Sequence, residues 1–238
     1  MKRVAYVLIN DFVHTDKRNL PFLSKYFDYT KWQVCVFRNW DAVCAMTAPD
    51  VFLDLRDPQF NWRQDSPNWY DCDISYQVAK FVTVEGSGYV AVHAGLLNIP
   101  VDHPIRTQVL KGSVVVPAGG TPLHCNMLVG KGLPGSPFNT FTDVAFIPQS
   151  AHPILNGIKE FIVRDEQYGV ELLENSDAVI LGNTVSEAAG SSIGAWAREA
   201  GNGRAAGITL GHLHNTLCNP MLQKLIANAI NWCGREIN

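Results

Sequence analysis

Short runs of apolar residues without polar alternation constrain the fold of this chain more than any other feature. Residues 4–9 are apolar at every position, and the polar pair Asn10-Asp11 ends the run. Residues 32–37, 51–55 and 89–92 are the next strand candidates. A strand that is apolar on both faces must be covered on both, which is typical of central strands in parallel sheets. The first half of the chain therefore predicts a buried parallel sheet.

Two segments between these runs predict the covering helices. Residues 18–27 and 73–85 both have a helical pattern. In the second segment the apolar side chains recur at helical spacing, at Ile74, Val78, Phe81 and Val82. The resulting order, β-α-β-β-α-β, favours an α/β fold: a doubly wound, mostly parallel sheet with helices on both faces.

The second half of the sequence is less regular. Residues 112–150 are rich in Gly, Pro, Ser and Thr, and such a long irregular stretch is more often functional than idle. Residues 141–146 alternate and predict an antiparallel addition to the sheet, followed by late strands at 178–181, 193–197 and 204–209. Asn219-Pro220 caps a final helix over residues 221–233. Because no linker interrupts these elements, we expect one domain over residues 1–238.

Composition and charge exclude several classes of protein. The 238 residues carry a formal net charge of -3 and no dense Lys/Arg run, whereas nucleic-acid binding needs a basic surface. No stretch approaches the roughly twenty apolar residues of a membrane span, and the first apolar run is too short for a secretory signal. The six cysteines form no C-x-x-C pair, which favours reduced thiols. We therefore expect a cytoplasmic protein that binds neither nucleic acid nor membrane.

Three histidines follow predicted strands directly. His14 comes after the first strand, His93 after the strand at 89–92, and His212 after the strand at 204–209. In an open parallel sheet, ligands bind outside the carboxyl ends of the strands, so these imidazoles are expected to converge on one crevice. His214, two residues past His212, is a further candidate for the same crevice. For any single histidine, the alternative is an imidazole with a structural or surface role.

A compact polar cluster, Asp165-Glu166-Gln167-Tyr168, lies between two apolar runs. In an extended segment Glu166 and Tyr168 share a face, which would allow a general base or metal ligand and a hydroxyl that donates to it. The alternative is a solvated turn. His124 ends a loop that begins with Gly119-Gly120 and is a candidate for substrate contact.

Several familiar motifs are absent from the sequence. It contains no G-x-G-x-x-G after the first strand and no G-x-x-x-x-G-K-[ST], so we expect no nucleotide cofactor. It also has no serine or cysteine in a nucleophile elbow, and His93 stands at the strand-to-turn position where such an elbow would lie.

Three blocks in order resemble the ThuA-like (trehalose utilisation) family, whose fold is similar to the flavodoxin-like class I glutamine amidotransferases. The first is GYVAVHAG at residues 88–95, which resembles the family's strand and "LHS" turn. The second is HPILNGI at 152–158 followed by DEQY at 165–168. The third runs from Gly203-Arg204 through LGH at 210–212 and Asn219-Pro220 to Trp232. The first loop, with His14, and the segment Gly120 to His124 are looser matches.

The sequence departs from the family pattern at three places. Arg164 stands where some relatives have a histidine, Val170 where a glutamate occurs, and Leu213 where an acidic residue often follows LGH. Any metal binding that uses those side chains in relatives is in question here. The missing elbow cysteine means that the fold does not bring glutamine hydrolysis with it.

The resemblance implies a role in carbohydrate metabolism, on a sugar or 3-keto-sugar derivative. A keto group acidifies the neighbouring C–H, so a base and a group that stabilises the enolate suffice for isomerisation, epimerisation or elimination. We expect His93, Glu166 and His212 to be catalytic, and the same three to hold a divalent metal such as zinc or manganese. His14, His124, Tyr168 and His214 are then substrate contacts.

The alternative is a carbohydrate-binding or regulatory protein without catalysis. Aromatic residues at positions 60, 62, 69 and 70 give it some support, because sugars stack on aromatic faces. The same aromatics are consistent with an interface between two copies in a homodimer.

Overall fold

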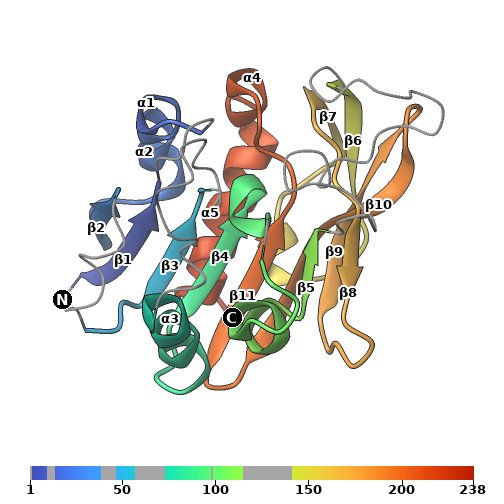
Figure 1. Cartoon of the computed structure of the whole chain (residues 1–238). Coiled ribbons are helices and arrows are strands. Elements are labelled where there is room, and N and C mark those ends of the chain that lie inside the picture. Colours follow the sequence, from blue (N-terminus) through green and yellow to red (C-terminus); the bar gives the residue numbers. More distant parts are fainter. Residues whose placement is uncertain (1, 10–13, 39–46, 57–72, 98, 115–140) are drawn as a thin grey trace, which may run out of the picture.

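A computed structural model describes residues 2–9, 14–38, 47–56, 73–97, 99–114 and 141–238. Within these ranges a nine-stranded sheet crosses the molecule (Figure 1). In spatial order its strands are β2 (Trp32–Phe37), β1 (Arg3–Leu8), β3 (Val51–Asp54), β4 (Gly88–Val92), β11 (Gly203–Ile208), β10 (Gly190–Ala200), β9 (Val179–Ser186), β6 (Thr142–Pro148) and β7 (Phe161–Asp165). A separate two-stranded ribbon pairs β5 (Gly112–Val114) with β8 (Val170–Leu172).

One half of the large sheet is parallel. β2, β1, β3, β4 and β11 pair in that order, each parallel to its neighbour. Numbered along the chain, this is the flavodoxin-like strand order 2-1-3-4-5. The predicted fold class is confirmed, and so are the strands expected from the continuous apolar runs. The carboxyl ends of these five strands lie at one edge, which is where the sheet can present a site.

The other half of the sheet is antiparallel. β10 pairs with β11 and β9, β6 pairs with β9, and β7 pairs with β6, all antiparallel. The antiparallel addition predicted at 141–146 is therefore confirmed. A turn at Gly201-Asn202 joins β10 to β11.

Helices cover both faces of the sheet. On one face, Val7, Val90 and Ile208 pack into a core with the apolar side chains of α5 (Pro220–Cys233) and α2 (Leu23–Tyr26). On the other, Tyr89 and its neighbours pack with α3 (Asp73–Thr83) and the π-helix η5 (Ile105–Leu110). The shorter helices are α1 (Asp16–Asn19), η1 (Leu20–Phe22), η4 (His93–Leu96), η6 (Pro153–Leu155) and α4 (His214–Leu217). No helix among the described residues is long and apolar enough to cross a membrane.

The structure differs from the sequence expectations in two places. The helix predicted at 18–27 is divided into α1, η1 and α2, because Pro21 removes a backbone donor and tightens the chain into a 3-10 turn. Within the segments that had no predicted element, the structure forms η5, β5, β7 and β8. The loop at 119–124 and the aromatics at 60–70 lie outside the described residues.

Candidate functional site

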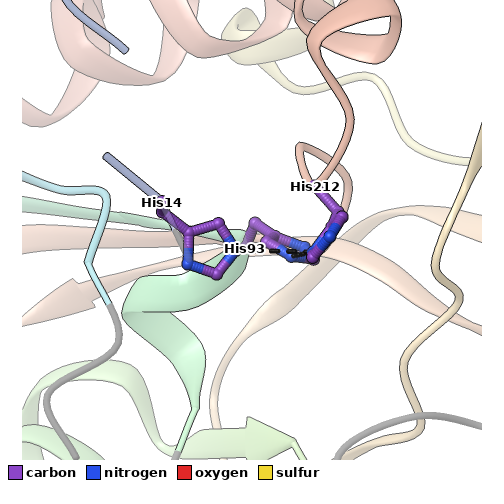
Figure 2. Close-up of side chains that lie close together, drawn as sticks. All are labelled: His14, His93 and His212. Atoms are coloured by element: carbon purple, nitrogen blue, oxygen red, sulfur yellow. Dashed lines mark hydrogen bonds between the residues drawn. The ribbon is translucent and has the colours of Figure 1, made fainter. Parts of the chain in front are cut away.

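Three loops at the carboxyl edge of the parallel half bring His14, His93 and His212 together (Figure 2). His14 follows β1, His93 directly follows β4, and His212 lies between β11 and α4. One ring nitrogen of each histidine lies within 4.8 Å of the other two. His14 and His93 are buried, whereas the side chain of His212 remains 16% exposed. The exposed surface of the three imidazoles is therefore largest at His212.

His93 occupies a sharp strand-to-helix turn. Its backbone has a φ of 49°, a conformation uncommon for residues other than glycine, and it begins η4 directly after β4. Gly95 permits the tight turn, because a Cβ there would lie 2.5 Å from the carbonyl oxygen of Asp54 at the end of β3. The turn has the form of a nucleophile elbow, with an imidazole at the position of the nucleophile.

The hydrogen bonds of His93 define which nitrogen is available. Its Nδ1 lies 2.9 Å from the carbonyl oxygen of Thr209, so Nδ1 carries the proton and donates it. Burial, reinforced by the neighbouring His212 and His14, lowers the pKa of His93 well below its usual value. The ring is therefore neutral, and the lone pair of Nε2 faces the cluster.

His212 Nδ1 lies at the centre of the three histidines. It is 3.1 Å from His93 Nε2 and 3.4 Å from His14 Nε2. The His14 ring meets the other two edge to face, with centroid distances of 5.2 Å to each. The three nitrogens point at a shared volume.

Glu166 and Tyr168 complete the cluster from the segment after β7. Glu166 Oε2 lies 3.2 Å from His212 Nδ1 and 3.4 Å from His93 Nε2. The Tyr168 hydroxyl lies 3.0 Å from that oxygen and 2.9 Å from His93 Nε2. Tyr168 is buried, so the alternative of a solvated turn is wrong for this residue.

Tyr168 stacks on the imidazole of His93. The two rings are nearly parallel, at 15°, with centroids 4.7 Å apart. The Tyr168 hydroxyl donates to Glu166 Oε2 and also lies within hydrogen-bonding distance of His93 Nε2. The phenol therefore links the carboxylate to the imidazole.

The remaining histidines lie elsewhere or serve the fold. The expectation that His214 reaches the crevice is not met, because the chain turns into α4 at this residue and its exposed ring packs against Phe22, with centroids 5.2 Å apart. His103 and His152 each accept a hydrogen bond from a backbone N–H two residues further along the chain, which is a structural role. His124 lies outside the described residues.

The donor set fits a divalent metal. Metal–nitrogen bonds of about 2.0–2.1 Å in a tetrahedral arrangement separate neighbouring donor atoms by about 3.3 Å. His212 Nδ1 lies 3.1 Å from His93 Nε2 and 3.4 Å from His14 Nε2, and the donor atoms of the three histidines all lie within 4.8 Å of one another. Imidazole suits zinc and other first-row metals. The structure thus places His14 beside His93 and His212, which the sequence had suggested as ligands.

Two residues that the sequence analysis left without a role hold the turn that carries His212. The Asp165 carboxylate accepts from the backbone N–H groups of Gly211, His212 and Leu213, and the Arg18 guanidinium donates to the carbonyl oxygen of Gly211. Burial raises the pKa of Asp165, and the three amides oppose that shift. Contacts to backbone groups leave no pattern in the sequence, so nothing in it pointed to these two roles.

The sequence model of the ThuA family, described as trehalose utilisation, matches residues 39–233. The chain belongs to the ThuA family. No curated protein sequence matches this ThuA-family chain.

Solved structures share the fold of this ThuA-family chain. A ThuA-like protein from Parabacteroides merdae superposes with a TM-score of 0.70 at 14% identity, over 99% of this chain and 91% of that one. A ThuA-like protein from Bacteroides uniformis gives 0.66 at 15% identity, over 97% and 91%. The β-galactosidase from Bacillus circulans gives 0.57 at 10% identity, over 97% of this chain but 31% of that one. At these identities the likeness establishes the fold alone.

Proposed function

We propose that this ThuA-family chain is an enzyme that abstracts a proton next to a carbonyl group of a sugar or 3-keto-sugar derivative, with the help of a divalent metal. The observation that carries the proposal is the convergence of three imidazole nitrogens with a carboxylate and a phenol. Imidazole nitrogens gathered this closely suit metal ligation, because imidazole is a common ligand of zinc and other first-row metals.

The three histidines would hold the metal in this proposal. His93 offers Nε2 because Thr209 occupies its Nδ1, and His14 and His212 offer the nitrogens nearest to it. When bound, a zinc or manganese ion would stabilise the negative charge on an enolate oxygen as a Lewis acid.

Glu166 is the best candidate for the base. Its side chain is 12% exposed, and its Oε2 lies 3.2 Å from His212 and 3.4 Å from His93. The Tyr168 hydroxyl donates to Glu166 Oε2, which holds that carboxylate oxygen beside the cluster. Glu166 can take the proton from the carbon beside the keto group and return it to the same or a neighbouring carbon. Such transfers give epimerisation or isomerisation, and loss of a leaving group gives elimination.

The test separates proton abstraction from metal binding. The protein is incubated in D₂O with 3-keto-glucosides, and loss of the C2 proton is followed by NMR while bound metal is measured by elemental analysis. We expect exchange with the wild type and about one metal ion per chain. Glu166→Gln should retain the metal and lose exchange by a factor of about 10²–10⁴.

His214→Ala is the matched control for the histidine variants. It removes an exposed imidazole two residues from His212 and should change neither metal content nor exchange. Sugar binding by the wild type without any exchange would instead support a carbohydrate-binding or regulatory protein. Absence of metal after loading with zinc or manganese would refute the metal-assisted form of the proposal.

A further inference from the structure

The turn that carries His212 is held by a carboxylate rather than by regular secondary structure. Asp165 Oδ2 accepts from the N–H of Gly211 at 2.7 Å, and Oδ1 accepts from the N–H groups of His212 and Leu213, both at 3.1 Å. The Asp165 side chain is fully buried. Three consecutive backbone amides that converge on one anion fix the orientation of three peptide planes at once.

Arg18 holds the same turn from the opposite side. Its Nη2 donates to the carbonyl oxygen of Gly211 at 2.6 Å. Gly211 has a φ of 139°, which side chains rarely tolerate, and this conformation lets its N–H face Asp165 while its carbonyl faces Arg18. Both polar groups of the residue before His212 are therefore tied to charged side chains.

The two charged residues come from the segments that carry the other parts of the cluster. Arg18 lies four residues after His14, and Asp165 directly precedes Glu166. A further tie joins Thr216 in α4 to the carbonyl oxygen of Arg164 on β7, at 2.9 Å. The contacts that hold the His212 turn thus also fix its distance from His14 and Glu166.

We propose that Asp165 and Arg18 are positioning residues that hold the His212 imidazole in the geometry required for metal binding. The inference rests on the proposed function, because the ligand role of His212 belongs to it. Without these contacts the turn has to be ordered when the metal binds, and loss of outer contacts of this kind typically lowers metal affinity by about 10–100-fold.

A double-mutant cycle on Co²⁺ affinity tests the positioning role. Asp165→Asn, His212→Ala and the double variant are compared with the wild type by chelator competition, with the visible absorption of Co²⁺ as a report on the ligands. Asp165→Asn should lower Co²⁺ affinity by about 10–100-fold when His212 is present. It should have little further effect once His212 is gone, because it acts through that ligand. An equal loss in both backgrounds would overturn the proposal.

A second readout does not depend on metal. In the metal-free protein the ring resonances of His212 should form one set in the wild type and broaden or multiply in Asp165→Asn, while those of His152 stay unchanged. Unchanged His212 resonances would refute the positioning role. If the wild type binds no Co²⁺, the proposed metal chemistry fails, and these resonances still decide whether Asp165 positions the ring.

Two more variants test whether the effect is specific to the residues that hold the His212 turn. Asp143→Asn removes a carboxylate that is 77% exposed on the neighbouring strand β6 and should leave Co²⁺ affinity and the His212 resonances unchanged. Arg18→Gln removes the charge on the other side of the turn. It should reproduce the affinity loss and the line broadening in weaker form, and it decides the question if Asp165→Asn does not fold. A wild-type spectrum and affinity in a folded Arg18→Gln variant would remove Arg18 from the proposal.

Discussion

The two halves of the sheet contribute different chemistry to one site. The parallel half supplies nitrogen: His14, His93 and His212 all follow β1, β4 or β11 at the carboxyl edge. The antiparallel half supplies oxygen, because Glu166 and Tyr168 follow β7 and reach the same cluster. The comparison teaches that the site lies at the junction of the parallel and antiparallel halves and needs side chains from both.

The halves also differ in how their strands are buried. Every residue of β4 is buried, whereas β7 alternates between buried and exposed positions. A strand that is covered on both faces can place functional side chains only at its end. A half-exposed strand has alternating apolar and polar residues, which are common at the edges of sheets. This difference explains why the strands of the parallel half were easier to predict from the sequence than β7.

The largest expected effect on metal affinity follows from removing one of the proposed imidazole ligands of the parallel half. His93→Asn suits the positive φ of the turn, since asparagine tolerates that conformation better than most residues. We expect metal affinity to fall by more than about 100-fold, and turnover with it, in a chain that still folds. Isothermal titration with zinc measures the affinity, and a thermal melt shows whether the variant folds. Retention of full affinity would remove His93 from the ligand set.

A smaller effect is expected at the junction between the halves. Gly211→Ala strains a φ of 139° and brings a methyl group to 3.4 Å from the Cβ of His93. The strain costs of the order of 1–3 kcal/mol and should displace His212 from both Asp165 and Arg18. Urea unfolding and zinc titration should show both losses together. Lower stability with unchanged zinc affinity would mean that the turn does not position the ligand.

On the antiparallel side, Tyr168→Phe tests the phenol while the ring stacking on His93 is kept. It removes the 3.0 Å hydrogen bond to Glu166 but no proposed metal ligand. Turnover should fall by about 10–100-fold, in line with one hydrogen bond to a charged group of about 1.5–3 kcal/mol, while zinc content stays near that of the wild type. A variant that loses its zinc would instead place the phenol among the ligands.

The smallest effects compare the burial of the two halves directly. Ile162→Thr on β7 changes a residue that is 62% exposed and should alter the free energy of unfolding by less than about 0.5 kcal/mol. Val90→Thr on β4 buries a hydroxyl and should cost about 1–3 kcal/mol. Equal costs in urea unfolding would contradict the different burial of the two strands.

The sequence predicted the parallel half well because its signals are local. Continuous apolar runs identify strands, and the strand-end rule then picks out His14, His93 and His212 without knowledge of the contacts between them. His214 was expected in the crevice because of its spacing from His212. That expectation failed, because spacing alone did not show that the chain enters α4 at this residue.

The antiparallel half was harder to predict because its contacts are distant and involve the backbone. The DEQY segment stood out as polar, yet β7 was not predicted, so the direction of Glu166 remained open. Asp165 contacts three amides that lie 46 to 48 positions further along the chain. Any three consecutive residues carry such amides, so no residue type reveals the partner.

The elbow at His93 has a consequence for redesign of the site. Its direction is set by the backbone turn and by the close approach of Gly95 to Asp54, rather than by the imidazole itself. A cysteine placed at this position would face the same cluster and present sulfur in place of nitrogen, which favours softer metals. The thiolate absorption of a cobalt-loaded His93→Cys variant would show whether the position accepts a new donor while the framework stays the same.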